Sequence, residues 1–389
     1  MSSASRDFAV VIHGATGFTG SLVAEYFARH VSRESVPWAL SGRNTDKLAA
    51  VRDRLAQIDA GCADVPLLNA ANDDPTALAS VAARTRVLIS TVGPYAQHGI
   101  PVVAACVQEG TDYLDITGEP LFVRQVQADF HARAVERDVA LVSCCGFDSI
   151  PTDLGVLYTV RQLPGDQPMH IDGFIEVKMQ ISGGTWNSAL GAMGDARKAM
   201  KAPPRPVIEG RSVRGVAGKP HRTKEYGWVV PMPTVDPEIA LRSAAELPEY
   251  GPDFSYAHYA CMGGIGRLAG MAAGATTTAV LAQSSTARNL LGRLRKSGDG
   301  PSREALESGW FKAHFHGRAG DASVRTEMSG GDPGYLETSK MVSEAALALA
   351  TQRDQLPRTG GALTTALCMG DVLIERLSRA GIRFRVVDQ

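Results

Sequence analysis

Short apolar runs alternate with amphipathic stretches over the first 150 residues of the chain. The runs predict buried strands over residues 8–13, 37–41, 65–68, 86–92, 112–115 and 140–143. The stretches between them predict helices over residues 21–30, 46–58, 75–84, 100–109 and 120–137. Regular alternation of buried strands and helices predicts an α/β fold, namely a Rossmann-type doubly wound parallel sheet.

The pattern changes after Pro151. Residues 171–182 predict a strand, residues 309–328 a hairpin, residues 334–351 a helix and residues 384–387 a final strand. We therefore predict a nucleotide-binding domain over residues 1–150, a second α+β substrate domain over 151–350, and a C-terminal segment, 351–389, that returns to the nucleotide-binding domain. Asp153 falls where a helix is expected to begin, so it is predicted to cap that helix.

A glycine-rich turn follows the first predicted strand. It consists of Gly14, Ala15, Thr16, Gly17, Phe18, Thr19 and Gly20. A Cβ atom on these glycines would block the tight turn, the approach of a phosphate, or the packing of the next helix on the strand. The unpaired N–H groups at the start of that helix favour an anion. The turn therefore predicts a site for the pyrophosphate of a dinucleotide.

The end of the second predicted strand indicates which dinucleotide binds. In NAD-binding domains this strand usually ends in Asp or Glu, which accepts hydrogen bonds from the ribose. This chain has Ser41, Gly42 and Arg43 there, with Lys47 one helical turn further on. A carboxylate would repel a 2′-phosphate, whereas a guanidinium pairs with it. We therefore predict NADP(H) as the cofactor; the alternative is that Arg43 is a solvated loop residue.

Three more strand ends carry Gly or Pro with polar neighbours. They consist of Thr91, Val92, Gly93, Pro94 and Tyr95; of Thr117 and Gly118; and of Cys145, Gly146, Phe147 and Asp148. Because ligands bind at the carboxyl ends of such strands, these turns are predicted to line one cofactor crevice. Tyr95 is predicted to be the catalytic acid, the alternative being that it walls the nicotinamide. Asp148 and Asp153 are further candidate acids, although a helix cap is the favoured role of Asp153.

The composition excludes several functions. The 389 residues carry a net charge of −1 and 44% hydrophobic residues, which suits two cores and gives no sign of nucleic-acid binding. The six cysteines lack metal-ligand spacing, and the first residues contain no hydrophobic signal segment, so we expect a cytoplasmic protein. His314 and His316 share a strand face, but no third ligand accompanies them, so no metal is predicted.

Two segments of the second domain indicate contacts beyond the cofactor. Residues 197–224 contain nine Lys or Arg against one acid, Glu209, in a sequence rich in Pro and Gly. They predict an exposed, mobile loop that is either merely solvated or docks an acidic group: a carrier protein, an anionic membrane surface or the cofactor phosphate. Residues 268–283 are uncharged and too short to cross a bilayer, which favours a buried helix over a peripheral membrane contact.

Six motifs, taken in order, resemble one family. They are Gly14–Gly20, Ser41–Arg43, Thr91–Tyr95, Asp112–Glu119, Cys145–Asp153 and Gly360–Asp371. The set resembles the saccharopine dehydrogenase-like oxidoreductases and, within them, is most similar to the mycobacterial-type trans-acting enoyl reductases of glycolipid assembly. The similarity covers nearly the whole chain. One departure is Ala71, where related sequences tend to carry an aspartate near the adenine.

The resemblance implies an NADP-dependent oxidoreductase that reduces the double bond of an enoyl thioester in lipid or polyketide biosynthesis. Its substrate would be an acyl thioester or lipid, and the chain is a candidate homodimer. Two alternatives stay open: a saccharopine-reductase-like imine reductase or dehydrogenase of amino acids, and a non-catalytic NADP-binding, lipid-associated protein. Short-chain dehydrogenases are disfavoured because none of the nine tyrosines has a lysine four residues further on.

Overall fold

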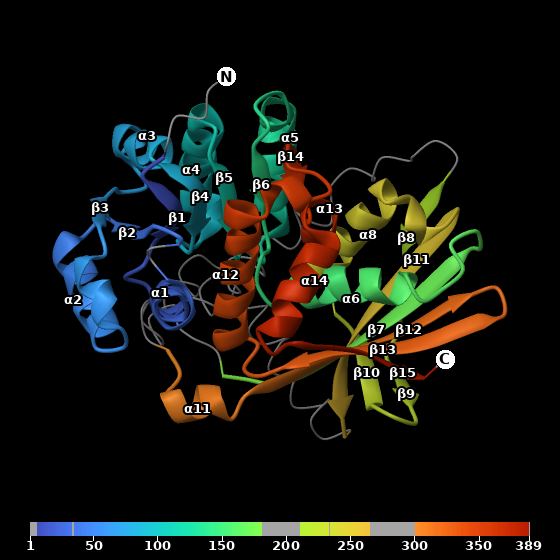
Figure 1. Ribbon diagram of the computed structural model, residues 1–389. Helices are drawn as coiled ribbons and strands as arrows, with labels where there is room; N and C mark the ends of the chain where they lie inside the picture. The colour runs from blue at the N-terminus through green and yellow to red at the C-terminus, as the bar shows by residue number, and fades with distance from the viewer. Residues whose placement is uncertain (1–5, 33–34, 181–210, 233, 265–299, 389) are drawn as a thin grey trace, which may run out of the picture. The chain divides into compact units, whose positions relative to one another are not determined.

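The computed structural model describes residues 6–32, 35–180, 211–232, 234–264 and 300–388 (Figure 1). The chain divides into two units. Unit 1 contains the described residues up to Phe147, together with Gly300 and residues 334–377, and unit 2 contains the other described residues. Unit 1 is therefore built from stretches that lie far apart in the sequence.

The sheet of unit 1 is parallel. Its strands are β1 (Phe8–His13), β2 (Trp38–Gly42), β3 (Leu67–Asn69), β4 (Thr85–Ser90), β5 (Asp112–Asp115), β6 (Ala140–Val142) and β14 (Gly361–Leu363). Their order is β14-β6-β5-β4-β1-β2-β3, and every neighbouring pair is parallel. β1 is buried along its whole length, which explains why its sequence is apolar on both faces. The predicted Rossmann-type doubly wound fold is confirmed.

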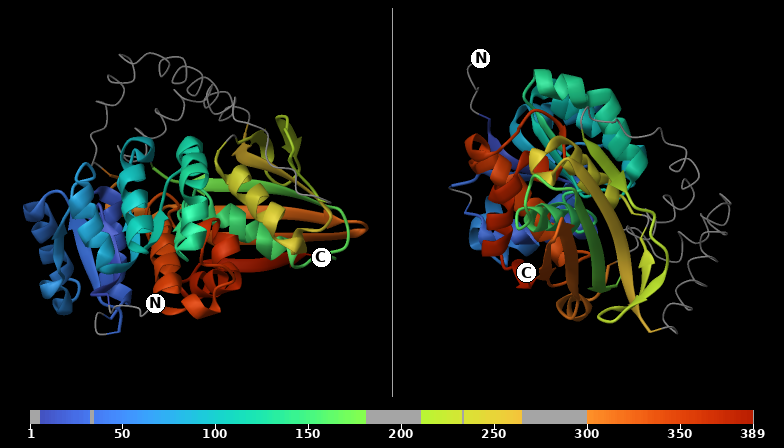
Figure 2. Two further views of the ribbon diagram at one scale, coloured as in Figure 1. Left: turned by 90° about the horizontal axis from the view of Figure 1, so that it is seen from above. Right: turned by 90° about the vertical axis from the view of Figure 1, so that its right-hand side faces the viewer.

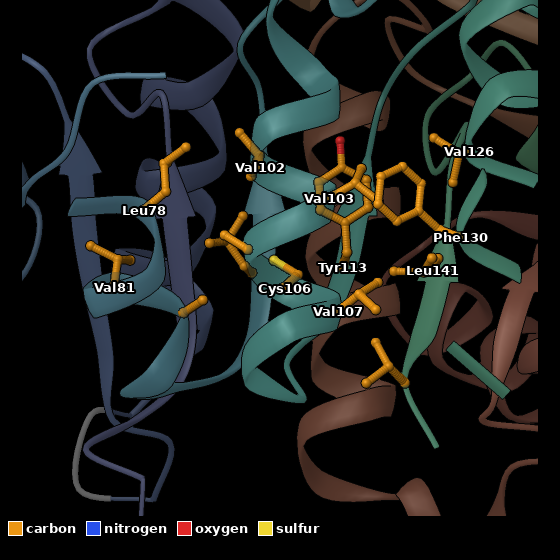
Figure 3. Packing of buried hydrophobic residues seen from close by; sticks show 14 of the residues in the cluster. Leu78, Val81, Val102, Val103, Cys106, Val107, Tyr113, Val126, Phe130 and Leu141 are labelled. Atoms are coloured by element: carbon orange, nitrogen blue, oxygen red, sulfur yellow. The ribbon is translucent and has the colours of Figure 1, made fainter. Parts of the chain in front are cut away.

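Helices cover both faces of this sheet (Figure 1). They are α1 (Phe18–His30), α2 (Thr45–Ala56), α3 (Pro75–Ala83), α4 (Tyr95–Glu109), α5 (Pro120–Glu136), α12 (Leu336–Thr351), α13 (Thr365–Cys368) and α14 (Gly370–Arg379), with short 3-10 turns at Ala60–Asp64 and Arg353–Gln355. On one face, Val103 of α4, Tyr113 of β5 and Phe130 of α5 belong to a single buried cluster (Figure 3). Full burial of each such side chain contributes about 1.5–3 kcal/mol.

The sheet of unit 2 is mixed. Its strands are β7 (Met169–Lys178), β8 (Ser212–Gly215), β9 (His221–Thr223), β10 (Gly227–Pro231), β11 (Asp253–Gly263), β12 (Trp310–Ala319), β13 (Ala322–Gly330) and β15 (Arg383–Asp388). Their order is β15-β13-β12-β7-β11-β10-β9, and β8 pairs with β11. The helices are α6 (Ile150–Val160), α8 (Asp236–Glu246) and α11 (Arg303–Glu307), with a 3-10 turn at Pro248–Tyr250. α6 and α8 lie along one face of the sheet (Figure 2).

The units differ from the predicted domains in their boundaries. α12 belongs to unit 1, so unit 2 is interrupted at residue 334, whereas the predicted second domain runs to residue 350. In the C-terminal segment, β14 pairs with β6 of unit 1, whereas β15 pairs with β13 of unit 2. The segment 351–389 therefore does not return as a whole to the nucleotide-binding domain, because it supplies one strand to each sheet.

Several elements begin elsewhere than predicted. α4 begins at Tyr95, five residues before the predicted start, because the Gly-Pro turn directly precedes the helix. α6 begins at Ile150, so Asp153 lies inside its first turn and does not cap it. Instead, the buried Asp153 carboxylate accepts a hydrogen bond of 2.5 Å from the Ser243 hydroxyl.

The first half of the basic segment and the whole of the uncharged segment lie outside the described residues. Residues 197–210 and 268–283 are not described. Residues 211–224 include β8 and β9, so this part of the basic segment is not a loop throughout. Within the described ranges, no helix is both long enough and apolar enough to cross a membrane.

Close packing of α6 on the sheet depends on Gly155. A Cβ atom at this position would lie 2.2 Å from Cε2 of Phe315, a fully buried residue of β12. One turn further on, the Thr159 hydroxyl lies 2.6 Å from the Thr326 hydroxyl of β13. At Gly155 the helix therefore lies too close to the sheet for any residue with a Cβ atom.

We expect Gly155→Ala to destabilise the protein. Alanine is better than glycine in a helix interior by about 1 kcal/mol, but overpacking against Phe315 costs about 1–3 kcal/mol and should prevail. Urea unfolding followed by fluorescence measures the change. Gly165→Ala is the matched control, because its nearest neighbour would be 3.9 Å away. Equal midpoints for the two variants would contradict this account of the packing.

Candidate functional site

The glycine turn between β1 and α1 is shaped by close backbone contacts. Gly14 has a φ of +87°, and a Cβ atom there would lie 2.6 Å from Cγ2 of Val92 and 2.7 Å from Oγ1 of Thr91. A Cβ atom at Gly20 would lie 2.3 Å from the Gly14 carbonyl oxygen. These two glycines are therefore required by the turn itself, whereas a Cβ atom at Gly17 would be 3.3 Å from the same oxygen.

Hydrogen bonds fix the turn to the neighbouring strand ends. The Gly14 N–H donates to the Ser41 carbonyl of β2 at 2.9 Å, and the Thr91 N–H donates to the His13 carbonyl at 2.9 Å. The Gly17 N–H donates back to the Gly14 carbonyl at 2.9 Å. The turn is thus anchored to the ends of β2 and β4, which flank β1.

The N-terminus of α1 has no side-chain cap. Gly17 occupies the N-cap position and has no side chain to accept hydrogen bonds from the first turn. The first-turn N–H groups and the positive end of the helix dipole therefore point out of the turn. These features, with the room left by Gly14 and Gly20, suit a pyrophosphate.

Buried residues at the end of β2 are followed by two exposed cationic side chains. Ser41 and Gly42 are buried, whereas Arg43 and Lys47 are exposed. Neither the Arg43 guanidinium nor the Lys47 ammonium has a hydrogen-bonding or ion-pair partner among the described residues. Arg43 is thus available to a phosphate, while Ser41 is turned inward.

A buried histidine, not predicted from the sequence, organises this end of the sheet. His13 Nδ1 lies 3.0 Å from the Ser41 hydroxyl, and Nε2 lies 3.0 Å from Oδ1 of Asn72. The Asn72 amide donates to the His98 carbonyl at 2.9 Å, so Oδ1 must accept and Nε2 must carry the proton. Burial lowers the pKa of His13 and keeps it neutral. The network ties the ends of β1 and β2 to the turn after β3.

Tyr95 does not have the position of a catalytic acid. Its side chain is buried, and its hydroxyl donates to the Ser90 carbonyl at 3.0 Å and accepts from the Ile116 N–H at 3.4 Å. Its ring packs against Phe122, with centroids 5.6 Å apart. Burial raises the pKa of Tyr95 well above its usual value. The hydroxyl therefore joins strand ends inside unit 1, which corrects the predicted role as proton donor.

Glu119 caps α4. Its Oε1 accepts from the Tyr95 N–H and its Oε2 from the Ala96 N–H, each at 2.9 Å. A carboxylate at a helix N-terminus satisfies free N–H groups and interacts favourably with the helix dipole. Because this carboxylate occupies the first turn of α4, that helix cannot offer the same N–H groups to a phosphate.

Asp115 holds the loops after β5 and β6 together. It is fully buried and accepts hydrogen bonds from the N–H groups of Thr117 and Cys144, both at 3.0 Å, and from the Ser143 hydroxyl at 2.8 Å. Burial raises the pKa of Asp115 to about 6, although these donors lower it. Both loops lie at the carboxyl ends of the strands, where the cofactor is predicted to bind. The hydrogen bonds of Asp115 therefore hold these two loops in position.

The other predicted site residues after β5 and β6 belong to loops of unit 1, except Asp148. Thr117 is buried, and its hydroxyl accepts from the Glu119 N–H at 3.1 Å. The buried Cys145 thiol donates to the Val142 carbonyl at 3.2 Å. The Phe147 N–H donates to the Thr338 hydroxyl of α12 at 3.0 Å. These residues shape the loops after β5 and β6, whereas Asp148 begins unit 2.

The paired histidines of β12 lie among carboxylates. His314 Nε2 is 3.4 Å from Oε2 of Glu176, and its Nδ1 is 3.5 Å from Oε2 of Glu327. His316 Nε2 is 2.9 Å from the Tyr226 hydroxyl. Over the residues that the structure describes, no group of three or more His, Cys, Asp or Glu side chains is arranged to hold a metal ion.

Comparisons with known proteins support a dinucleotide-binding domain in this chain. Residues 10–142 match the family described as the saccharopine dehydrogenase NADP binding domain. The chain is 32% identical to a trans-acting enoyl reductase of Mycobacterium bovis, covering 98% of both chains. It is 30% identical to a saccharopine dehydrogenase-like oxidoreductase of Rattus norvegicus, covering 100% of this chain and 99% of the other.

A solved structure shares the fold. Apo saccharopine dehydrogenase (L-Glu forming) of Saccharomyces cerevisiae matches with a TM-score of 0.53 and 12% identity, covering 97% of this chain and 99% of that chain. At this identity the likeness concerns the fold alone. The matched NADP-binding domain confirms the predicted cofactor class, and the glycine turn and Arg43 fit an NADP(H) phosphate on the geometry described above.

The inward position of the Tyr95 hydroxyl leads to a prediction. Tyr95→Phe should leave NADPH affinity and turnover within about twofold of wild type, while removal of the buried hydrogen bonds lowers stability by about 1 kcal/mol. Isothermal titration, steady-state kinetics and urea unfolding measure these changes. Tyr158→Phe is the control, since its hydroxyl has no partner among the described residues. A hundredfold loss of turnover at unchanged stability would restore Tyr95 as an acid.

Proposed function

The chain belongs to the saccharopine dehydrogenase-like oxidoreductases, and we propose that it uses NADPH to reduce the carbon–carbon double bond of an enoyl thioester. The reaction would serve lipid or polyketide biosynthesis. Full-length similarity to relatives named trans-acting enoyl reductases supports the substrate class. A saccharopine-like imine reductase is the second candidate, favoured by the shared fold.

The observation that carries the proposal is the intact phosphate turn beside an accessible arginine. Gly14 and Gly20 leave room that a Cβ atom would fill, and Gly17 leaves the first turn of α1 uncapped. Arg43 stands where NAD-specific domains carry an acid, and its guanidinium is exposed. This combination suits a dinucleotide with a 2′-phosphate.

The chain's own residues would divide the work as follows. The first-turn N–H groups of α1 hold the pyrophosphate, and Arg43 pairs with the 2′-phosphate. Bound NADPH supplies a hydride. The His13 network keeps the β2 end in place, and Asp115 and Glu119 keep the loops after β4, β5 and β6 in place. These residues act by position and do not exchange protons with a substrate.

Oxidation of NADPH with a substrate panel tests the proposal. The panel contains enoyl thioesters of increasing chain length, α-keto acids with amino acids, and NADPH alone. We expect turnover with enoyl thioesters and mass-spectrometric detection of the saturated product. Turnover confined to the keto acid and amino acid mixtures would favour the imine reductase. NADPH binding with no turnover of either class would favour a non-catalytic NADP-binding protein.

We predict that Arg43 sets the preference between cofactors. A charged hydrogen-bonded pair contributes about 1.5–3 kcal/mol, so NADPH should bind about tenfold or more tightly than NADH. Arg43→Ala should remove most of this preference and leave NADH affinity nearly unchanged. Fluorescence titration of both cofactors measures it, with Arg54→Ala, an exposed arginine of α2, as control. Equal affinities of wild type for both cofactors would refute the assignment.

We further propose that the described end of the basic segment docks an acidic acyl carrier. Arg214 is engaged with Asp253 at 2.6 Å, whereas Lys219, Arg222 and Lys224 are exposed around β9. Opposite charges raise encounter rates in a salt-dependent way. Their attraction would act on a carrier-bound substrate and leave a small thioester unaffected.

Neutralising these three cations tests the docking surface. The triple variant Lys219→Gln, Arg222→Gln, Lys224→Gln should lower kcat/KM for a carrier-bound enoyl substrate at low salt by about tenfold and spare a small enoyl thioester. The control replaces Arg29, Arg54 and Arg133, three exposed arginines of unit 1, with Gln. An equal effect on both substrates, or on neither, would show that β9 is not a docking surface.

A further inference from the structure

A buried histidine ends the apolar strand β1, directly before the glycine turn. The side chain of His13 is 1% exposed, and every residue before it in β1 is apolar and buried. An apolar side chain would fill this position without a desolvation cost, whereas a buried imidazole requires hydrogen-bonding partners. The partners of His13 therefore indicate what the histidine contributes.

The His13 side chain joins the ends of two other strand segments. Its Nε2–H donates to Oδ1 of Asn72, in the turn after β3, and its Nδ1 accepts from the Ser41 hydroxyl of β2, each at 3.0 Å. Both ring nitrogens are thus used, and neither partner carries a charge. Burial lowers the pKa of His13, so the ring stays neutral and keeps this one donor and this one acceptor.

The backbone of His13 joins a third strand end. Its carbonyl oxygen accepts from the N–H of Thr91, which follows β4, at 2.9 Å, and from the Thr91 hydroxyl at 3.1 Å. The Asn72 amide in turn donates to the His98 carbonyl of α4 at 2.9 Å. His13 therefore connects the ends of β1, β2 and β4 with the turn after β3, all within unit 1.

Two of these connected segments flank the position predicted for the adenosine half of the cofactor. Arg43, the predicted partner of the 2′-phosphate, follows Ser41 by two residues. The N–H of Ala70, in the turn after β3, donates to the Gly42 carbonyl at 3.1 Å, so this turn lies beside the residue that precedes Arg43. The adenine and the 2′-phosphate are attached to adjacent carbons of one ribose. A phosphate on Arg43 therefore places the base close to both segments.

We propose that His13 is a positioning residue for the adenosine half of NADP(H), because its imidazole holds the end of β2 and the turn after β3 at a fixed separation. The proposal rests on the NADP(H) binding of the proposed function and is independent of the substrate that is reduced. His13 itself is buried and acts through Ser41 and Asn72. Segments that are already ordered lose less entropy when the cofactor binds, which favours affinity.

Binding of the two halves of the cofactor tests this role without turnover. Adenosine 2′,5′-bisphosphate represents the adenosine half, and nicotinamide mononucleotide represents the other half. His13→Leu should weaken binding of the bisphosphate by about tenfold or more and change binding of the mononucleotide by less than about threefold. Isothermal titration of the full-length protein measures both affinities.

A glutamine at this position separates the hydrogen bonds from the rest of the side chain. His13→Gln offers an amide N–H to Asn72 and a carbonyl oxygen to Ser41, so it should retain the bisphosphate affinity to within about threefold. Thr85→Val is the matched control. It removes a buried hydroxyl that donates to the Val81 carbonyl at 2.6 Å, at the opposite end of β4. This variant should unfold at lower urea concentration than wild type and bind both fragments as wild type does.

Asn72→Ala tests the other end of the network without a change in the core. Asn72 is only partly buried, so this variant and His13→Gln decide the matter if His13→Leu does not fold. Asn72→Ala should also weaken binding of the bisphosphate selectively. The double variant His13→Leu, Asn72→Ala should bind it about as weakly as His13→Leu alone, since the two residues act through one contact. Independent, additive losses would contradict the proposal.

The outcomes separate this proposal from the proposed function. Equal weakening of both fragments by His13→Leu, or weakening of neither, overturns the role of His13, and so does a wild type that does not bind the bisphosphate. If the variants behave as expected but wild type reduces no enoyl thioester, the proposed function fails and the role of His13 stands. If wild type reduces enoyl thioesters and His13→Leu binds both fragments normally, the function stands and the role of His13 fails.

Discussion

The candidate cofactor site depends on the close approach of the glycine turn to the residues that follow β4. Gly14 has Thr91 and Val92 against it, and Gly20 has the Gly14 carbonyl against it, so neither position admits a side chain. These contacts fix the start of α1 relative to the parallel sheet. Its N–H groups are oriented before a ligand arrives, which reduces the entropy that binding must overcome.

The helices α1 and α4 both begin at the carboxyl ends of the parallel strands, but only one of them leaves its first-turn N–H groups free of a side-chain acceptor. Glu119 occupies the first turn of α4 with both carboxylate oxygens, whereas α1 begins at Gly17 and has no side-chain cap. An anion therefore finds free N–H groups at α1 and a negative charge at α4. Asp115 joins the adjoining loops by similar acceptor bonds, so the edge is held by carboxylates that receive backbone hydrogen bonds.

Features whose determining residues are contiguous in the chain could be predicted from the sequence. The parallel sheet and the glycine turn were predictable because strand periodicity and Gly14–Gly20 are local signals. The inward orientation of the Tyr95 side chain was not predictable, because its hydrogen-bonding partners Ser90 and Ile116 come from two other segments. α8 and β11 were missed because the Pro-rich sequence before them shows no clear alternation. A histidine ending an apolar strand, His13, was a signal that could have been used.

Burial raises the pKa of three aspartates of this fold, Asp112, Asp115 and Asp236, and their hydrogen-bonding partners differ. Asp112 and Asp115 are supplied with a guanidinium or with backbone N–H groups, which favour the charged form. Asp236 has only uncharged donors, the hydroxyls of Thr152 and Thr234 and its own N–H, and these do not offset the effect of burial, which raises its pKa. The partners of each carboxyl group, and not its residue type, therefore decide its chemistry.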